Sequence, residues 1–159
     1  MVNHEKTKHY ENLLSQITGL IAGENDEVSV LANVSAAIHY EMGFWWTGFY
    51  LVKDDILMLG PFQGPVACYR IKMGRGVCGT AWQRRETVIV DDVEQFPGHI
   101  ACSSESRSEI VVPLFAADGN VLGVLDIDSR ELSTFDVTDR QFLEQITRLV
   151  SAQLAKKPD

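Results

Sequence analysis

The sequence has few of the features that mark secreted, membrane-spanning or nucleic-acid-binding proteins. It contains three cysteines, an odd number, which favours free, metal-bound or catalytic thiols over a disulfide framework. It has no run of about 18 apolar residues, and its charged amino terminus lacks the apolar stretch of a signal peptide. The formal charge of −8 argues against a polyanion-binding surface. We therefore expect a cytoplasmic protein that binds neither membranes nor nucleic acid.

What the sequence does contain is typical of one globular domain. Hydrophobic residues make up 45% and charged residues 23% of a chain of 159 residues, which is long enough to bury one core. Apolar residues at helical spacing predict two helices at the start of the chain, the second beginning at Asn25-Asp26 and ending at Gly43. A long amphipathic helix is predicted at the end, where Asp136 and Asp139 resemble a capping box.

The middle of the chain predicts a sheet. The runs "FWWTGFYLV" and "ILML" indicate a hairpin that turns at Asp54-Asp55. The runs "VACYRIKM" and "TVIVD" indicate two further strands, with a short helix around Thr80 to Arg84 between them. Residues 92–108 show no periodicity, and an irregular segment of that length inside a compact domain is usually functional. Cys102 lies in this segment.

The run "EIVVPLFAADGNVLGVLDIDS" predicts a second hairpin with a definite register. If Asp118-Gly119 forms a two-residue turn, the numbers of paired residues add up to 237, so Glu109 lies opposite Asp128. Asp126 then lies on the same face, because side chains alternate along a strand. A three-residue loop would shift this register and undo the pairing. The opposite face is predicted to be core, filled by Ile110, Val112, Leu114, Val121, Leu125 and Ile127.

Carboxylates crowded at one end of a hairpin raise one another's pKa or bind a cationic group. We therefore interpret Glu109, Asp126 and Asp128 as part of a binding site. The alternative is that this end of the hairpin is exposed and that the three acids are simply solvated.

Two motifs suggest other ligands. The run "GRGVCG", residues 74–79, matches the G-x-G-x-x-G dinucleotide pattern, but the helix after it is too short for a βαβ crossover. Its glycines are expected to allow a tight turn and close packing. Cys68, Cys78, Cys102 and His99 could in principle bind zinc, although they lack the C-x2-4-C spacing of structural zinc sites. We expect neither a metal nor a cofactor.

The runs "LGPFQGPVACYRIKMGRGVCGTA", "GHIAC", "SEIVVPL" and "GVLDIDS" together resemble the free methionine-(R)-sulfoxide reductases, small enzymes built on a stand-alone GAF domain. The resemblance extends from about Tyr10 to Leu154, and the three cysteines with these flanks are its specific feature. It implies an α+β fold with a mostly antiparallel six-stranded sheet flanked by helices on both sides. It also implies that residues 1–159 form a single GAF domain and that the protein is a homodimer.

The resemblance implies a role for each cysteine. Cys102 matches the nucleophile that attacks the sulfoxide sulfur and becomes a sulfenic acid, and Cys68 matches the resolving cysteine that condenses with it. Cys78 matches a third cysteine of secondary role. The Cys68–Cys102 disulfide would then be reduced by thioredoxin or a similar dithiol.

The resemblance also implies a substrate pocket. Asp126 is expected to protonate the sulfoxide oxygen, while Glu109 and Asp128 hold the ammonium group of the free amino acid. Trp46 and Tyr50 match aromatic residues that enclose the methyl group, and their spacing of four on a strand puts them on one face. Both would serve equally well as ordinary core. The same alternation predicts that Trp45 points away from the pocket.

Two other functions remain open. A GAF module that senses a small ligand, such as a cyclic nucleotide, normally passes its signal to an attached output domain, for which 159 residues leave no room. A thiol redox switch without a substrate would explain the cysteines but would leave Glu109, Asp126 and Asp128 without a role. The sequence therefore favours reduction of free L-methionine-(R)-sulfoxide.

Overall fold

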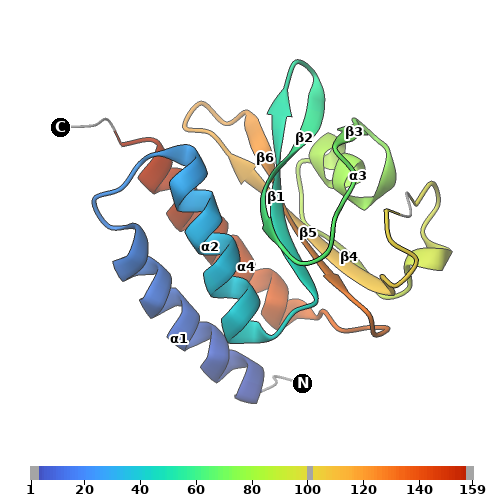
Figure 1. Ribbon diagram of the computed structural model, residues 1–159, viewed down its shortest axis with the longest axis horizontal. Helices are drawn as coiled ribbons and strands as arrows, with labels where there is room; N and C mark the ends of the chain where they lie inside the picture. The colour runs from blue at the N-terminus through green and yellow to red at the C-terminus, as the bar shows by residue number, and fades with distance from the viewer. Residues whose placement is uncertain (1–3, 100–101, 157–159) are drawn as a thin grey trace.

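The computed structural model describes residues 4–99 and 102–156, and in these residues a six-stranded sheet separates two groups of helices (Figure 1). The helices α1 (His4–Ile21), α2 (Glu27–Met42) and α4 (Val137–Leu154) cover one face of the sheet. The shorter α3 (Gly76–Arg84) lies on the other face. The predicted α+β fold with helices on both sides is confirmed. None of the described helices is both long and apolar enough to cross a lipid bilayer.

The sheet is antiparallel throughout its described pairs, in the order β3-β2-β1-β6-β5-β4. Its two long hairpins, β1–β2 and β5–β6, meet along the β1–β6 pair at the centre. The strands are β1 (Trp46–Lys53), β2 (Ile56–Gln63), β3 (Arg70–Lys72), β4 (Val88–Val90), β5 (Ser108–Phe115) and β6 (Val121–Ser129).

The helix ends follow the local signals in the sequence. Asp26 caps α2 by accepting a hydrogen bond from the Ser29 backbone N–H, and Gly43 ends that helix with a φ of 70°. Asp136 and Asp139 form the predicted capping box of α4. Helix α3 differs from the prediction, because it begins inside the glycine run, four residues before Thr80. A Cβ at Gly79 would lie 2.5 Å from the Lys72 carbonyl oxygen, so the glycine serves close packing, as expected.

Two apolar cores lie on the two faces of the sheet. The larger joins the sheet to α1, α2 and α4, and it includes fully buried side chains such as Leu13, Leu31 and Leu143. The smaller lies under α3 and includes Trp46, Tyr50, Trp82 and Val111. Each fully buried side chain of this size contributes about 1.5–3 kcal/mol. The larger core therefore supports the sheet, and the smaller core fills the space between the sheet and α3.

The β5–β6 hairpin has the predicted register but not the predicted turn. Glu109 pairs with Asp128 and Val111 pairs with Asp126, as expected. However, the Ala116 N–H donates to the Asn120 carbonyl, which makes a three-residue loop instead of the two-residue turn at Asp118-Gly119.

The expected slip of register is cancelled by an irregularity in β6. Leu114 pairs with Gly123 and Phe115 pairs with Val121, so Leu122 is an extra residue that restores the pairing beyond it. The same bulge moves Val121 to the α3 side of the sheet, so its assignment to the larger core was wrong. The other five predicted residues of that face do lie in the larger core.

The predicted strand "VACYRIKM" is mostly wrong. Only residues 70–72 pair with β2, at the edge of the sheet, and of these three residues Ile71 is buried. Tyr69 is 72% exposed and Met73 is 49% exposed. The chain before Arg70 has left the ladder, so the alternation of a strand does not apply to it.

Helix α1 is tied to the start of α4 by a buried polar cluster. The Tyr10 hydroxyl donates to Asp139, and the Lys6 ammonium group donates to the same carboxylate over 2.7 Å. Tyr10 and Asp139 are fully buried. A buried carboxylate that loses one of its donors carries a desolvation cost of about 1–3 kcal/mol.

We predict that Tyr10→Phe lowers the free energy of unfolding by about 1–3 kcal/mol, because it removes a donor to Asp139 and leaves the ring in place. Urea unfolding followed by circular dichroism measures the change. The matched control is Tyr40→Phe, since Tyr40 is 78% exposed, and it should leave the unfolding midpoint unchanged. Equal losses in the two variants would contradict a structural role for the buried hydroxyl.

Candidate active site

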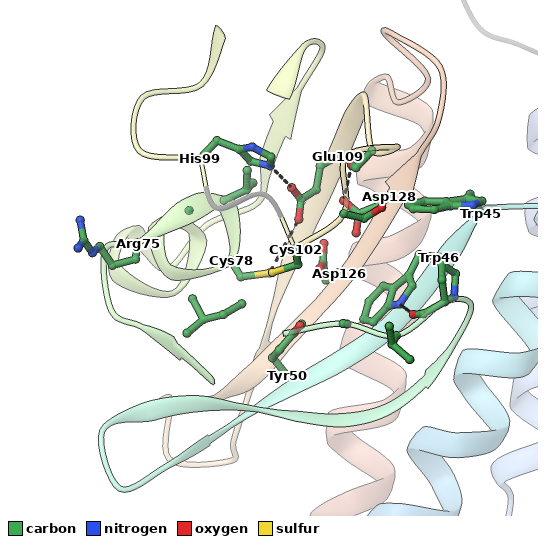
Figure 2. Close-up of a pocket in the computed structure, with 18 residues that line it drawn as sticks. Trp45, Trp46, Tyr50, Arg75, Cys78, His99, Cys102, Glu109, Asp126 and Asp128 are labelled. Atoms are coloured by element: carbon green, nitrogen blue, oxygen red, sulfur yellow. Dashed lines mark hydrogen bonds and ion pairs between the residues drawn. The ribbon is translucent and has the colours of Figure 1, made fainter. Parts of the chain in front are cut away.

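A cavity of about 60 Å³ lies on the α3 side of the sheet, between the central strands and the amino end of α3 (Figure 2). Strands β1, β5 and β6 form its floor, and the segments before β3 and before β5 form its rim. Seven of the eight predicted site residues line it: Trp46, Tyr50, Cys78, Cys102, Glu109, Asp126 and Asp128. The eighth, Cys68, is covalently joined to Cys102.

The three acids converge in the cavity, as the predicted register requires (Figure 2). Glu109 and Asp126 are 6% and 5% exposed, and the solvated alternative is therefore excluded for them. Burial raises the pKa of Glu109 well above its usual range, and the nearby Asp126 and Asp128 raise it further. Burial likewise raises the pKa of Asp128 and of Asp126. The cluster therefore favours a bound proton or a bound cation.

One carboxylate oxygen of the three acids has no hydrogen-bond partner among the described residues. Ser106 donates to Asp128 over 3.1 Å, and His99 Nε2 lies 4.0 Å from a Glu109 oxygen. Burial lowers the pKa of His99, so its ring is neutral at pH 7 and does not offset the negative charge. Asp126 Oδ1 is buried without a hydrogen-bond partner among the described residues. A buried polar atom of this kind normally marks a place for a ligand or a water molecule.

Two of the three cysteines form a disulfide at the rim. Cys68 and Cys102 are bonded, with their Cα atoms 5.5 Å apart, within the range that a disulfide spans. The backbone carbonyl of Cys68 accepts a hydrogen bond of 2.8 Å from the Tyr50 hydroxyl, which ties the rim to β1. The pairing implied by the family resemblance is thus present, and the structure represents the oxidised form.

Cys78 is the free cysteine, and it is buried in the cavity close to Glu109 (Figure 2). Its sulfur lies 4.0 Å from Glu109 Oε2. Burial raises the pKa of the Cys78 thiol well above its usual value, and Asp126 and Glu109 add to the rise. This thiol therefore stays protonated at neutral pH and is a poor nucleophile.

One set of residues could hold a metal ion within the described part of the chain. Cys78, Glu109 and Asp126 bring ligand atoms within 4.8 Å of one another. The different zinc set considered from the sequence needs Cys68 and Cys102 as thiolates, and their disulfide prevents it in this form.

Aromatic side chains form one wall of the cavity. The rings of Trp46 and Tyr50 lie 6.2 Å apart and nearly parallel, and the Trp46 indole N–H donates to the Pro65 carbonyl over 2.9 Å. Gly64 has a φ of 126°, and a Cβ there would lie 2.8 Å from the Trp46 ring, so only glycine fits. Trp46 is thus held on several sides. Its neighbour Trp45 also lines the cavity, contrary to the prediction.

Comparison with known proteins identifies the family. Residues 24–155 match the model of the GAF domain. The chain belongs to the GAF domain family. It is 58% identical over 146 residues to the GAF domain-containing protein A of Dictyostelium discoideum, covering 91% of this chain and 92% of that protein. It is 46% identical over 151 residues to the free methionine-R-sulfoxide reductase of Escherichia coli (strain K12), covering 94% and 91%.

A solved structure agrees with these relatives. The X-ray structure of free methionine-R-sulfoxide reductase from Neisseria meningitidis in complex with its substrate superposes on this GAF domain with a TM-score of 0.92. The two chains are 49% identical, and the match covers 97% of this chain and 93% of the other. The resemblance found in the sequence is therefore confirmed.

Some residues of this GAF domain's cavity were not found from the sequence. Trp45 was missed because it precedes β1, so strand alternation does not fix its direction. Ser106 lies in an irregular segment, and nothing in its sequence context indicates that it bonds to Asp128. His99 was considered only as a zinc ligand, and the structure instead puts it beside Glu109.

We predict that Glu109→Gln stabilises this GAF domain at neutral pH. Because burial and two neighbouring acids raise the folded-state pKa of Glu109, its ionisation favours the unfolded chain above about pH 4.5, and glutamine removes that effect. Calorimetry at pH 7 should show a melting temperature at least about 2–4 °C higher, the shift that 1 kcal/mol produces in a chain of this size.

The gain should shrink as the pH falls and disappear near pH 4, where the carboxyl is protonated in both states. Glu11→Gln, on the exposed side of α1, is the control and should change nothing at either pH. A gain in Glu109→Gln that stayed the same at pH 4 would show that charge is not its cause.

Proposed function

We propose that this GAF domain reduces free L-methionine-(R)-sulfoxide to methionine. One observation carries the proposal: a disulfide lies next to an acidic cavity. Cys102 lines the same cavity as Glu109, Asp126 and Asp128, and it is bonded to Cys68. Relatives named free methionine-R-sulfoxide reductase, similar over nearly the whole chain, support the same reaction.

The chemistry proceeds in three balanced steps. The Cys102 thiolate attacks the sulfoxide sulfur while an acid of the cavity gives one proton to the sulfoxide oxygen; the oxygen passes to the cysteine, methionine leaves, and Cys102 becomes a sulfenic acid. The Cys68 thiol then attacks that sulfenic sulfur, which forms the disulfide and releases water. A dithiol finally supplies two electrons and two protons, restoring both thiols, and we propose thioredoxin or a similar dithiol for this step.

The acids serve both binding and proton transfer. We assign Asp126 as the proton donor to the sulfoxide oxygen, because it is buried, its pKa is raised, and its Oδ1 lacks a partner among the described residues. Glu109 and Asp128 hold the substrate's ammonium group. That cation would offset the crowding of negative charge, so binding should return the pKa values of these acids toward their usual range.

Binding of the ammonium group by Glu109 and Asp128 favours the free amino acid over a methionine sulfoxide residue in a protein. A peptide-bound residue has a neutral amide instead of an ammonium group, so the buried acids would stay uncompensated. For the substrate's carboxylate we propose the first turn of α3, where Gly76 and Val77 line the cavity and Arg75 provides no side-chain cap.

A homodimer, a cytoplasmic location and a single domain over residues 1–159 remain predictions.

The deciding experiment uses the purified protein with dithiothreitol and each epimer of free methionine sulfoxide. We predict that methionine forms from the R epimer and not from the S epimer, and that Cys102→Ser abolishes turnover. Cys78→Ser should retain activity, since its buried, protonated thiol is not the proposed nucleophile. Normal turnover by Cys102→Ser would refute the assignment. If the Cys68–Cys102 disulfide formed and was reduced again but no methionine appeared, the protein would be a thiol redox switch instead.

A separate prediction concerns Cys68. Cys68→Ser should release one methionine per protein molecule in the absence of reductant, because the first step needs only Cys102. It should then stop with thioredoxin as the reductant, since no intramolecular disulfide can form. Quenched-flow measurement of methionine together with a sulfenic acid probe tests this. Sustained turnover with thioredoxin at the wild-type rate would contradict a resolving role.

A further inference from the structure

The segment that carries Cys68 has an unusual exposed surface. Val66 is 87% exposed, Tyr69 is 72% exposed and Met73 is 49% exposed, so three of the chain's exposed large hydrophobic side chains lie within eight residues. All three flank the half-buried Cys68. Clustered apolar side chains at the surface often mark an interaction site.

This surface also carries the opposite charge to the rest of the molecule. The whole chain has a formal charge of −8, yet residues 66–75 contain three basic residues and no acidic residue. Arg70, Lys72 and Arg75 are exposed close to Cys68 in the sequence. A partner with an acidic surface would be attracted here and repelled elsewhere.

The segment is held in place on both sides of the cysteine. The Cys68 carbonyl accepts from Tyr50, and the neighbouring Tyr69 carbonyl accepts from the Leu59 backbone N–H over 2.9 Å. Strand β3 then pairs with β2 at the edge of the sheet, which anchors Arg70 to Lys72. Binding on a surface fixed in this way costs little conformational entropy.

The residues around Cys102 differ in character from those around Cys68. The residues after Cys102, Ser103 to Ser106, are polar and include the exposed Glu105. Ser103 to Ser106 therefore offer neither an apolar anchor nor a basic residue, and the first basic residue after Cys102 is the exposed Arg107. The two sulfurs of one disulfide thus lie in chemically different surroundings.

We propose that the exposed side chains of residues 66–75 form a docking surface for a protein dithiol, one that is apolar and acidic around its attacking cysteine. This inference rests on the proposed function, which requires the Cys68–Cys102 disulfide to be reduced. The partner's thiolate attacks the Cys68 sulfur, the disulfide breaks, and Cys102 leaves as a thiolate ready for the next substrate. The partner's second thiol then attacks the mixed disulfide, releasing the Cys68 thiol and leaving the partner oxidised.

The first test compares a protein reductant with a small one. In Arg70→Glu/Lys72→Glu, and separately in Tyr69→Ser/Met73→Ser, the KM for thioredoxin should rise at least tenfold. Turnover with dithiothreitol and the KM for methionine sulfoxide should stay unchanged, because dithiothreitol needs no docking surface. Salt should raise the wild-type KM for thioredoxin more than that of the charge-reversed variant. The control Arg140→Glu/Arg148→Glu makes the same charge change at exposed positions of α4 and should leave the KM unchanged.

The second test identifies the sulfur that is attacked. Thioredoxin lacking its second active-site cysteine should be trapped on Cys68 of the oxidised protein, with Cys102 free for alkylation, as read by mass spectrometry of the peptides. Trapping on Cys102, or an unchanged thioredoxin KM in both surface variants, would overturn the inference. Failure to form methionine even with dithiothreitol would instead refute the proposed function, and trapping would still test the docking surface.

Discussion

The convergence of three carboxyl groups on one face of the β5–β6 hairpin, with those of Glu109 and Asp126 buried and that of Asp128 half-buried, is the constraint on which the rest of the site depends. Glu109 and Asp128 face each other across the strands, and Asp126 lies beside them with one oxygen unpartnered among the described residues. Such an arrangement destabilises the fold, because burial disfavours the charged form of each acid. The large core on the other face, which includes Ile110, Ile127 and their neighbours, offsets that cost and fixes the register.

The acids also determine what their neighbours can do. Burial raises the pKa of Cys78 and of Tyr50 and the acids raise both further, so both groups stay protonated, and the Tyr50 hydroxyl remains a donor to the Cys68 carbonyl. The Cys78 thiol is free and buried, whereas the Cys102 sulfur is bonded to Cys68 at the rim. One cluster of negative charge thus favours a cationic ligand and makes a proton available inside the cavity.

The parts of this fold that could be predicted from the sequence are those set by local chemistry. Caps, turns and alternation gave the ends of α2, the capping box at Asp136 and the shared face of the acids. The turn of the second hairpin was wrong, and the register was still right only because a bulge at Leu122 compensates, which no local signal reveals. Trp45 was misplaced because it lies just outside β1 and strand alternation was applied to it, and the strand predicted over "VACYRIKM" was longer than β3.

The shortness of β3 has a physical meaning for the proposed cycle. A full strand over residues 66–73 would have kept the chain in the sheet, with its backbone groups paired along the edge. Instead the ladder ends at Arg70, and the preceding residues cross the rim of the cavity, where Cys68 joins Cys102. A resolving cysteine has to face in two directions, inward to a sulfenic acid and outward to a reductant. An irregular segment anchored at Cys68 by Tyr50 and at Tyr69 by Leu59 meets both needs, and the shortness of β3 is therefore part of the site.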